Sequence, residues 1–135
     1  GDSPVAAAAF VKKIPDAKLR NITFGVMVAG MMQRESPLGN EVLVLDECKQ
    51  ITDLPLRNEC VHSMTNGMME HGSPGKEYVQ ALSVCNALLA EGEDALSRIC
   101  FTTVSRSLNR FYTPKEKLAI CEEFPSDYRP KCSEV

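Results

Sequence analysis

The strongest constraint in the sequence is a set of six cysteines that recurs in step with a helical pattern. Three Leu-x-x-Cys segments are each followed by a turn, an Asp and a second Cys. An even number of cysteines in a chain of 135 residues is typical of a disulfide framework formed in an oxidising compartment. The cysteine pairs in question are Cys48 and Cys60, Cys85 and Cys100, and Cys121 and Cys132.

The cysteine pairs belong to a longer internal repeat. A small residue, at Gly30, Gly67 or Ser107, is followed six residues later by Ser-Pro or Thr-Pro and then by a Leu-x-x-Cys segment. The first two copies share a period of 37 residues, from Gly30 to Gly67. Repeated units of this length indicate stacked supersecondary elements. We therefore expect residues 1–135 to form a single all-α domain with repeats near 22–58, 59–98 and 99–132.

The repeated positions also predict where helices begin. A Ser or Thr before Pro is a favourable helix start, because the hydroxyl caps an orphan N–H and Pro has no N–H to leave unpaired. The Asp residues before Leu54, Ala95 and Tyr128 suit helix starts equally well. Short loops favour an array of antiparallel helix hairpins, about six to seven helices in all. The expected helices lie near residues 4–13, 16–33, 38–51, 54–70, 75–90, 95–111 and 114–123, with a short last turn near 127–132.

The repeat favours one disulfide pairing among the 15 that six cysteines allow. In the sequential pairing Cys48–Cys60, Cys85–Cys100 and Cys121–Cys132, each bridge brackets one turn between two helices. This placement can bring the Cα atoms within the 4.4–6.8 Å that a disulfide requires. Each closed loop would then stabilise the fold by about 3 kcal/mol. No C-x-x-C motif is present, so we interpret the cysteines as structural bridges rather than redox groups.

Charge and hydropathy exclude several classes of function. The net charge is −3, and the acidic side chains concentrate in residues 34–95, which hold eleven acidic and four basic residues. No stretch is basic enough to predict nucleic-acid binding. The longest apolar run, roughly Ile22 to Met32, is too short for a transmembrane segment. No signal peptide is visible, and we expect that one was removed from a secreted or periplasmic chain.

Four methionines repeat with the same period as the cysteines. The pattern M-x-x-x-M-M places Met27 with Met31, and Met64 with Met68, on one helix face. Such a stripe is most often core, but it also forms pliable binding surfaces, and thioethers can hold Cu(I). We retain these four residues as a possible binding surface and expect no metal or other cofactor.

Few polar residues form a recognisable site. Arg106 and Arg110 lie one turn apart and either line a solvated helix face or hold a carboxylate or phosphate. His62 and His71 are nine residues apart on one expected helix, so they cannot form an i, i+4 metal pair. Asn21 begins an N-glycosylation sequon inside an expected helix, and the sequence does not determine whether it is ever modified. No catalytic constellation is visible, and we expect no enzyme.

The two-helix unit with one turn-bracketing cysteine pair resembles the cysteine-rich helical repeat proteins. These are secreted bacterial relatives of the tetratricopeptide class. The resemblance covers about residues 22–132 in organisation. It implies a concave protein-binding surface rather than an active site.

Two functions from different classes follow. The first is an extracytoplasmic protein-binding or scaffold module, whose stacked helix pairs expose a surface for a protein or peptide. The second is a carrier that encloses a lipid or other small hydrophobic ligand. An open groove favours the binding module, and a closed internal void favours the carrier.

Overall fold

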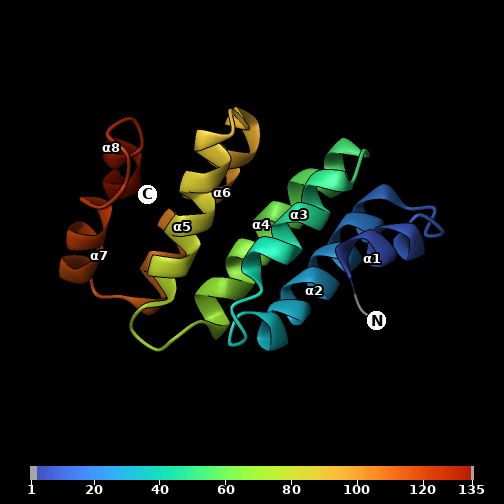
Figure 1. Ribbon diagram of the computed structural model, residues 1–135, viewed down its shortest axis with the longest axis horizontal. Helices are drawn as coiled ribbons and strands as arrows, with labels where there is room; N and C mark the ends of the chain where they lie inside the picture. The colour runs from blue at the N-terminus through green and yellow to red at the C-terminus, as the bar shows by residue number, and fades with distance from the viewer. Residues whose placement is uncertain (1–2, 135) are drawn as a thin grey trace.

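The computed structural model describes residues 3–134, and this part of the chain is all-α, with eight helices and no strand (Figure 1). The all-α prediction is therefore confirmed. The helix count exceeds the expected six to seven because the short last turn forms a helix of its own, α8. The helices are α1 (Pro4–Val11), α2 (Ala17–Glu35), α3 (Glu41–Gln50), α4 (Leu54–His71), α5 (Glu77–Ala90), α6 (Asp94–Phe111), α7 (Pro114–Cys121) and α8 (Arg129–Glu134).

Side-chain caps fix the starts of α2, α4 and α7. The carboxylates of Asp16 and Asp53 accept hydrogen bonds from the backbone N–H groups of Leu19 and Leu56, at 2.8 and 3.1 Å. Thr113 forms a complete capping box with Glu116. These caps confirm the helix starts predicted at Asp53 and Thr113. The other two expected Asp starts are each displaced by one residue, because α6 already includes Asp94 as its first residue and α8 begins only at Arg129.

Two of the three Ser/Thr-Pro sites do not start helices, contrary to the prediction. Ser36-Pro37 and Ser73-Pro74 form turns, and the following helices begin only at Glu41 and Glu77. The cause is a glycine shortly after each proline: Gly39 and Gly75 have φ values of 74° and 77°, which a right-handed helix cannot contain. The third site has no such glycine, and its helix starts directly after Thr113.

The longest helices pack on one another rather than mainly on their neighbours in sequence. Helix α2 contacts α4 far more extensively than it contacts α3, and α4 in turn contacts α6. A Cβ atom added at Gly67 would lie 2.6 Å from Cβ of Met32 and 2.9 Å from the carbonyl oxygen of Ala29. Small residues thus let α2 and α4 approach closely, as expected for Gly67. The same expectation is wrong for Gly30, where an added Cβ would meet nothing within 4 Å.

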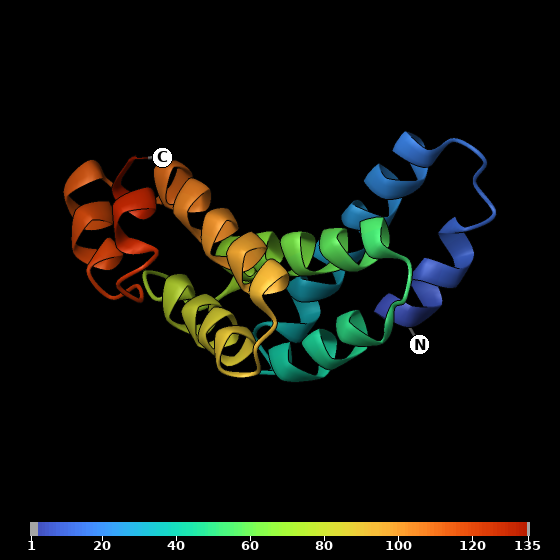
Figure 2. The ribbon, with the colours of Figure 1, turned by 90° about the horizontal axis from the view of Figure 1, so that it is seen from above.

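Figure 2 shows that this packing gives the molecule a curved shape. Helix α4 (green) crosses the floor of the concave side, and α2 and α6 rise on either side of it. The shorter helices α3 and α5 lie on the opposite, convex side. The hairpin prediction is therefore matched only in part, since the concave surface is built by three helices that are not consecutive in sequence.

Three disulfides connect the shorter helices to the helices that follow them. Cys48–Cys60 joins α3 to α4, Cys85–Cys100 joins α5 to α6, and Cys121–Cys132 joins α7 to α8. The Cα–Cα distances are 5.5, 5.4 and 5.6 Å, and all six sulfurs belong to buried residues. The predicted pairing is confirmed. The first two bridges fix the convex helices α3 and α5 to helices that form the concave surface, and the third fixes α8 to α7.

A candidate binding groove on the concave side

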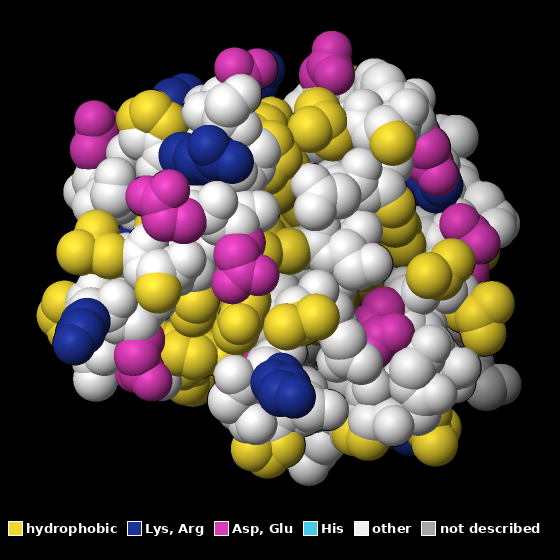
Figure 3. Space-filling model, turned by 60° about the vertical axis from the view of Figure 1, so that its left-hand side comes forward, with side chains coloured by type: hydrophobic (Ala, Val, Ile, Leu, Met, Phe, Trp, Pro, Cys, Tyr) yellow, Lys and Arg dark blue, Asp and Glu magenta, His cyan; other side chains and the backbone are white. Residues whose placement is uncertain are grey.

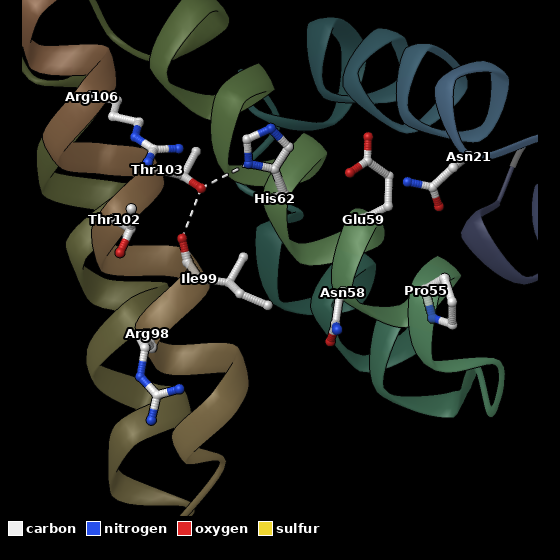
Figure 4. A pocket seen from close by; sticks show the side chains of 10 residues that line it. All are labelled: Asn21, Pro55, Asn58, Glu59, His62, Arg98, Ile99, Thr102, Thr103 and Arg106. Carbon is white, nitrogen blue, oxygen red and sulfur yellow. Dashed lines mark hydrogen bonds between the residues drawn. The ribbon is translucent and has the colours of Figure 1, made fainter. Parts of the chain in front are cut away.

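An open groove lies on the concave side of the molecule. It has a volume of about 490 Å³ and lies between α4 and α6, with one end reaching α2 (Figure 4). Its volume is in the range of pockets that bind small molecules or short peptide segments. The lining residues are Asn21 from α2, Pro55, Asn58, Glu59 and His62 from α4, and Arg98, Ile99, Thr102, Thr103 and Arg106 from α6.

A chain of hydrogen bonds holds α4 and α6 together along the groove. The Thr103 hydroxyl donates to the carbonyl oxygen of Ile99 at 2.7 Å, so its oxygen accepts from Nδ1 of His62 at 2.9 Å. Nε2 of His62 then accepts from the Asn66 amide at 3.3 Å, and the Asn66 oxygen accepts from the Ser107 hydroxyl at 3.2 Å. The network therefore assigns a neutral His62 with its proton on Nδ1.

The hydrogen-bond chain explains why a groove opens here. Between α2 and α4, glycine permits close backbone contact. Between α4 and α6, the polar side chains of His62, Asn66 and Thr103 stand between the two backbones and keep them farther apart. Ser107 occupies the repeat position that corresponds to Gly67, and its hydroxyl bonds Asn66 instead of allowing closer approach.

The α6 wall of the groove is basic. Arg98 and Arg106 are exposed, and Figure 4 shows both side chains on α6, on the opposite side of the groove from Glu59 and Asn21. The α4 wall carries Glu59, which lies beside Asn21 near α2. The groove is therefore electrically asymmetric, with positive charge on the α6 side and a carboxylate on the far side.

The structure separates the two arginines that the sequence pairs. Arg106 lines the groove, whereas Arg110 forms an ion pair with Glu70 at 3.6 Å and lies 5.0 Å from the ring centre of Phe111. Arg98 was missed by the sequence analysis. It lies eight residues before Arg106, and an i, i+4 stripe through Thr102 is the pattern that would have found it.

The four methionines are distributed between the core and a separate shallow cavity. Met64 and Met68 are fully buried, and the Met64 sulfur lies 3.9 Å from the Cys48 sulfur of a disulfide. Their side chains therefore contribute to the core and not to a surface. Met31 is also a buried core residue, and together with the half-buried Met27 it borders a cavity of about 220 Å³ next to Arg34, away from the groove. Among residues 3–134, no cluster of three or more His, Cys, Asp or Glu side chains could hold a metal ion.

A second polar cavity lies at the corner between α6 and α7. Lys117 is buried there and donates to the Asn109 side-chain oxygen at 2.8 Å, and burial lowers the pKa of its ammonium group. Nearby, the Tyr112 hydroxyl donates to Glu77 at 2.6 Å, and burial, assisted by this bond, raises the pKa of the phenol above its usual range. These contacts fasten α7 and α5 to α6.

Charge is also distributed over other faces. Viewed toward the α7–α8 end, the surface shows hydrophobic side chains in furrows between scattered acidic and basic groups, and no histidine is visible on it (Figure 3).

None of the helices in the described part of the chain is long and apolar enough to cross a bilayer. Comparison of the chain with protein-family models, curated proteins and solved structures finds no match.

Proposed function

We propose that this chain is an extracytoplasmic binding module whose concave groove takes a segment of a protein or peptide partner. The observation that carries the proposal is the open groove between α4 and α6, with exposed arginines on one wall. Three buried disulfides support a rigid scaffold, because Cys48–Cys60 and Cys85–Cys100 tie the convex helices α3 and α5 to α4 and α6, which line the groove, and Cys121–Cys132 ties α7 to α8. They also support an oxidising compartment, secreted or periplasmic, as the place where the chain works.

The open shape of the groove and the charged side chains that line it favour a peptide segment over the hydrophobic ligand of the alternative function. A carrier of a lipid is expected to enclose its ligand within apolar walls, since burial of apolar surface drives that binding. Here charged and polar side chains line much of the groove, including Glu59, Arg98 and Arg106. A peptide backbone can satisfy such groups with its own donors and acceptors.

Peptide selection with a groove-blocking variant tests this function. The oxidised protein is immobilised and presented with a random peptide display library, and selected peptides are re-measured with Asn58→Trp and Asn86→Trp. Asn58 is exposed and lines the groove, whereas Asn86 is exposed on α5 and outside it. We expect selected peptides to lose binding to Asn58→Trp and to keep it with Asn86→Trp.

Two results would overturn the proposal. One is a selection that yields no peptide sensitive to Asn58→Trp. The other is a lipid or other hydrophobic molecule that co-purifies with the chain, seen by native mass spectrometry, and is displaced by the same variant. The second result would favour the carrier function.

A further inference from the structure

The arginines of the groove differ from the other arginines of the chain in having no partner. Arg57 and Arg110 pair with Glu93 and Glu70, and Arg34 pairs with Glu35. Arg20 and Arg129 donate to backbone carbonyl oxygens. Within residues 3–134, the two arginines that form no hydrogen bond or ion pair are Arg98 and Arg106, and both line the groove.

The distance between Arg98 and Arg106 indicates which kind of anion can bind both side chains. Arg98 and Arg106 are eight residues apart on one helix, which separates their backbone positions by about 12 Å. One carboxylate or phosphate reaches only about 3 Å to a donor, so it does not bridge both side chains as they stand. A segment with two separate carboxylates fits the pair. An extended chain rises about 3.3 Å per residue and covers this distance in about four residues, with positions i and i+4 on the same side.

The groove favours an extended segment over a helix. An extended segment covers the distance from Arg98 to Arg106 with about four residues, whereas a helix lying along α6 needs about eight.

The far side of the groove is unsuited to a second row of acidic side chains. Glu59 lies there, and the neighbouring surface between α2 and α4 includes Ile22 and Val26, whose side chains are 52% and 69% exposed. Like charges facing Glu59 are unfavourable, whereas apolar side chains next to Ile22 and Val26 remove apolar surface from water. The two walls therefore suit a segment with one acidic and one apolar edge.

We propose that the groove binds an extended acidic segment of a partner protein, with carboxylates about four residues apart on Arg98 and Arg106 and apolar side chains directed toward α2. This inference rests on the proposed binding function and specifies the chemistry of its partner. It is carried by charge complementarity between a carboxylate pair and the two free guanidinium groups.

Fluorescence anisotropy with synthetic peptides tests the proposal. The probe is a labelled peptide of about 12 residues in which Glu alternates with Val, long enough to cross the groove in any register. Matched probes carry Gln or Lys in place of Glu. The variant Arg98→Glu/Arg106→Glu is compared with Lys115→Glu/Lys131→Glu, which changes the net charge equally on exposed positions of α7 and α8.

We expect the arginine double variant to bind the Glu peptide at least about ten-fold more weakly and to bind the Lys peptide better than the unaltered protein does. The lysine double variant should keep its affinity for the Glu peptide within about two-fold, because those charges are separated from the groove. Circular dichroism and a disulfide count confirm that both variants are folded.

The results separate this inference from the function on which it rests. Equal weakening by both double variants, or equal binding of the Glu and Gln peptides, overturns the acidic-segment inference. The acidic-segment inference is also overturned if inorganic phosphate binds Arg98 and Arg106 at a single site and thereby prevents the peptide from binding. If display-selected peptides depend on Asn58 but are not acidic and bind the arginine double variant normally, the binding function stands and the inference is wrong.

Discussion

Replacing Gly67 by alanine is predicted to destabilise the protein, although alanine is the better helix former. Gly67 lies in the middle of α4, where its lack of a side chain lets α2 approach. The added Cβ would lie 2.6 Å from Cβ and 2.8 Å from Cγ of Met32, and 2.9 Å from the carbonyl oxygen of Ala29. Neither a Cβ nor a carbonyl oxygen can rotate away, so the two helices must separate.

The magnitude follows from two opposing effects. Alanine in place of glycine in a helix stabilises by about 1 kcal/mol. Overpacking a tight contact costs about 1–3 kcal/mol, and contacts with fixed atoms place Gly67 at the upper end of that range. We therefore expect a net loss of about 2 kcal/mol in the free energy of unfolding. Part of the loss comes from α2 packing, because α2 and α4 form the most extensive helix pair of the fold.

Gly30→Ala is the matched control. Gly30 holds the corresponding repeat position in α2, but it is exposed and an added Cβ meets nothing within 4 Å. This variant should therefore gain up to about 1 kcal/mol from helix propensity alone. Urea unfolding of the oxidised proteins, followed by circular dichroism, measures both values from the midpoint and slope. Changes of the same sign in the two variants would refute the reasoning from helix contact.

Three further predictions concern local features. Thr113→Ala removes a capping box and should lower the free energy of unfolding by about 1 kcal/mol. Ser73→Ala, at an exposed turn, should change it by less than about 0.5 kcal/mol in the same urea experiment. Equal effects of the two variants contradict the assignment of Thr113 as a helix cap and Ser73 as a turn residue. Long-range ¹H–¹⁵N NMR should find the His62 proton on Nδ1, and a proton on Nε2 contradicts the hydrogen-bond chain. Burial, with the bond to Glu77, raises the pKa of Tyr112, so above a pH of about 10 the folded chain keeps a proton that the unfolded chain releases. The free energy of unfolding should then fall as the pH rises past about 10, and this fall should be smaller for Tyr112→Phe. Urea titrations at several pH values measure the fall, and an equal fall in the two proteins contradicts the prediction.

The sequence located one of the groove's two free arginines and missed the other. The sequence indicated Arg106 because Arg110 follows it by one helical turn, but Arg110 forms an ion pair with Glu70. Arg98 lies two turns away from Arg106, beyond the one-turn spacing by which the sequence pairs Arg106 with Arg110. The groove brings together α4 and α6, whose contacting residues are about 40 positions apart, as His62 and Thr103 illustrate. Helical periodicity carries no information on contacts between such distant segments.

Local chemistry alone determined much of the architecture. Caps such as Asp53 and Thr113 are satisfied within four residues, so their helix starts follow from the sequence. The repeat also selected the disulfide pairs, because each bridge closes a short loop between adjacent helices.

The tertiary structure decided what depends on contacts between distant helices. Gly30 and Gly67 occupy equivalent repeat positions, but only Gly67 faces another backbone. Met31, Met64 and Met68 belong to the core, while Met27 is only half-buried and borders a surface cavity. A repeat specifies which residues are equivalent in sequence, whereas burial depends on which helix lies opposite. The packing of α2, α4 and α6 determines which helix lies opposite each residue, and the same packing creates the groove.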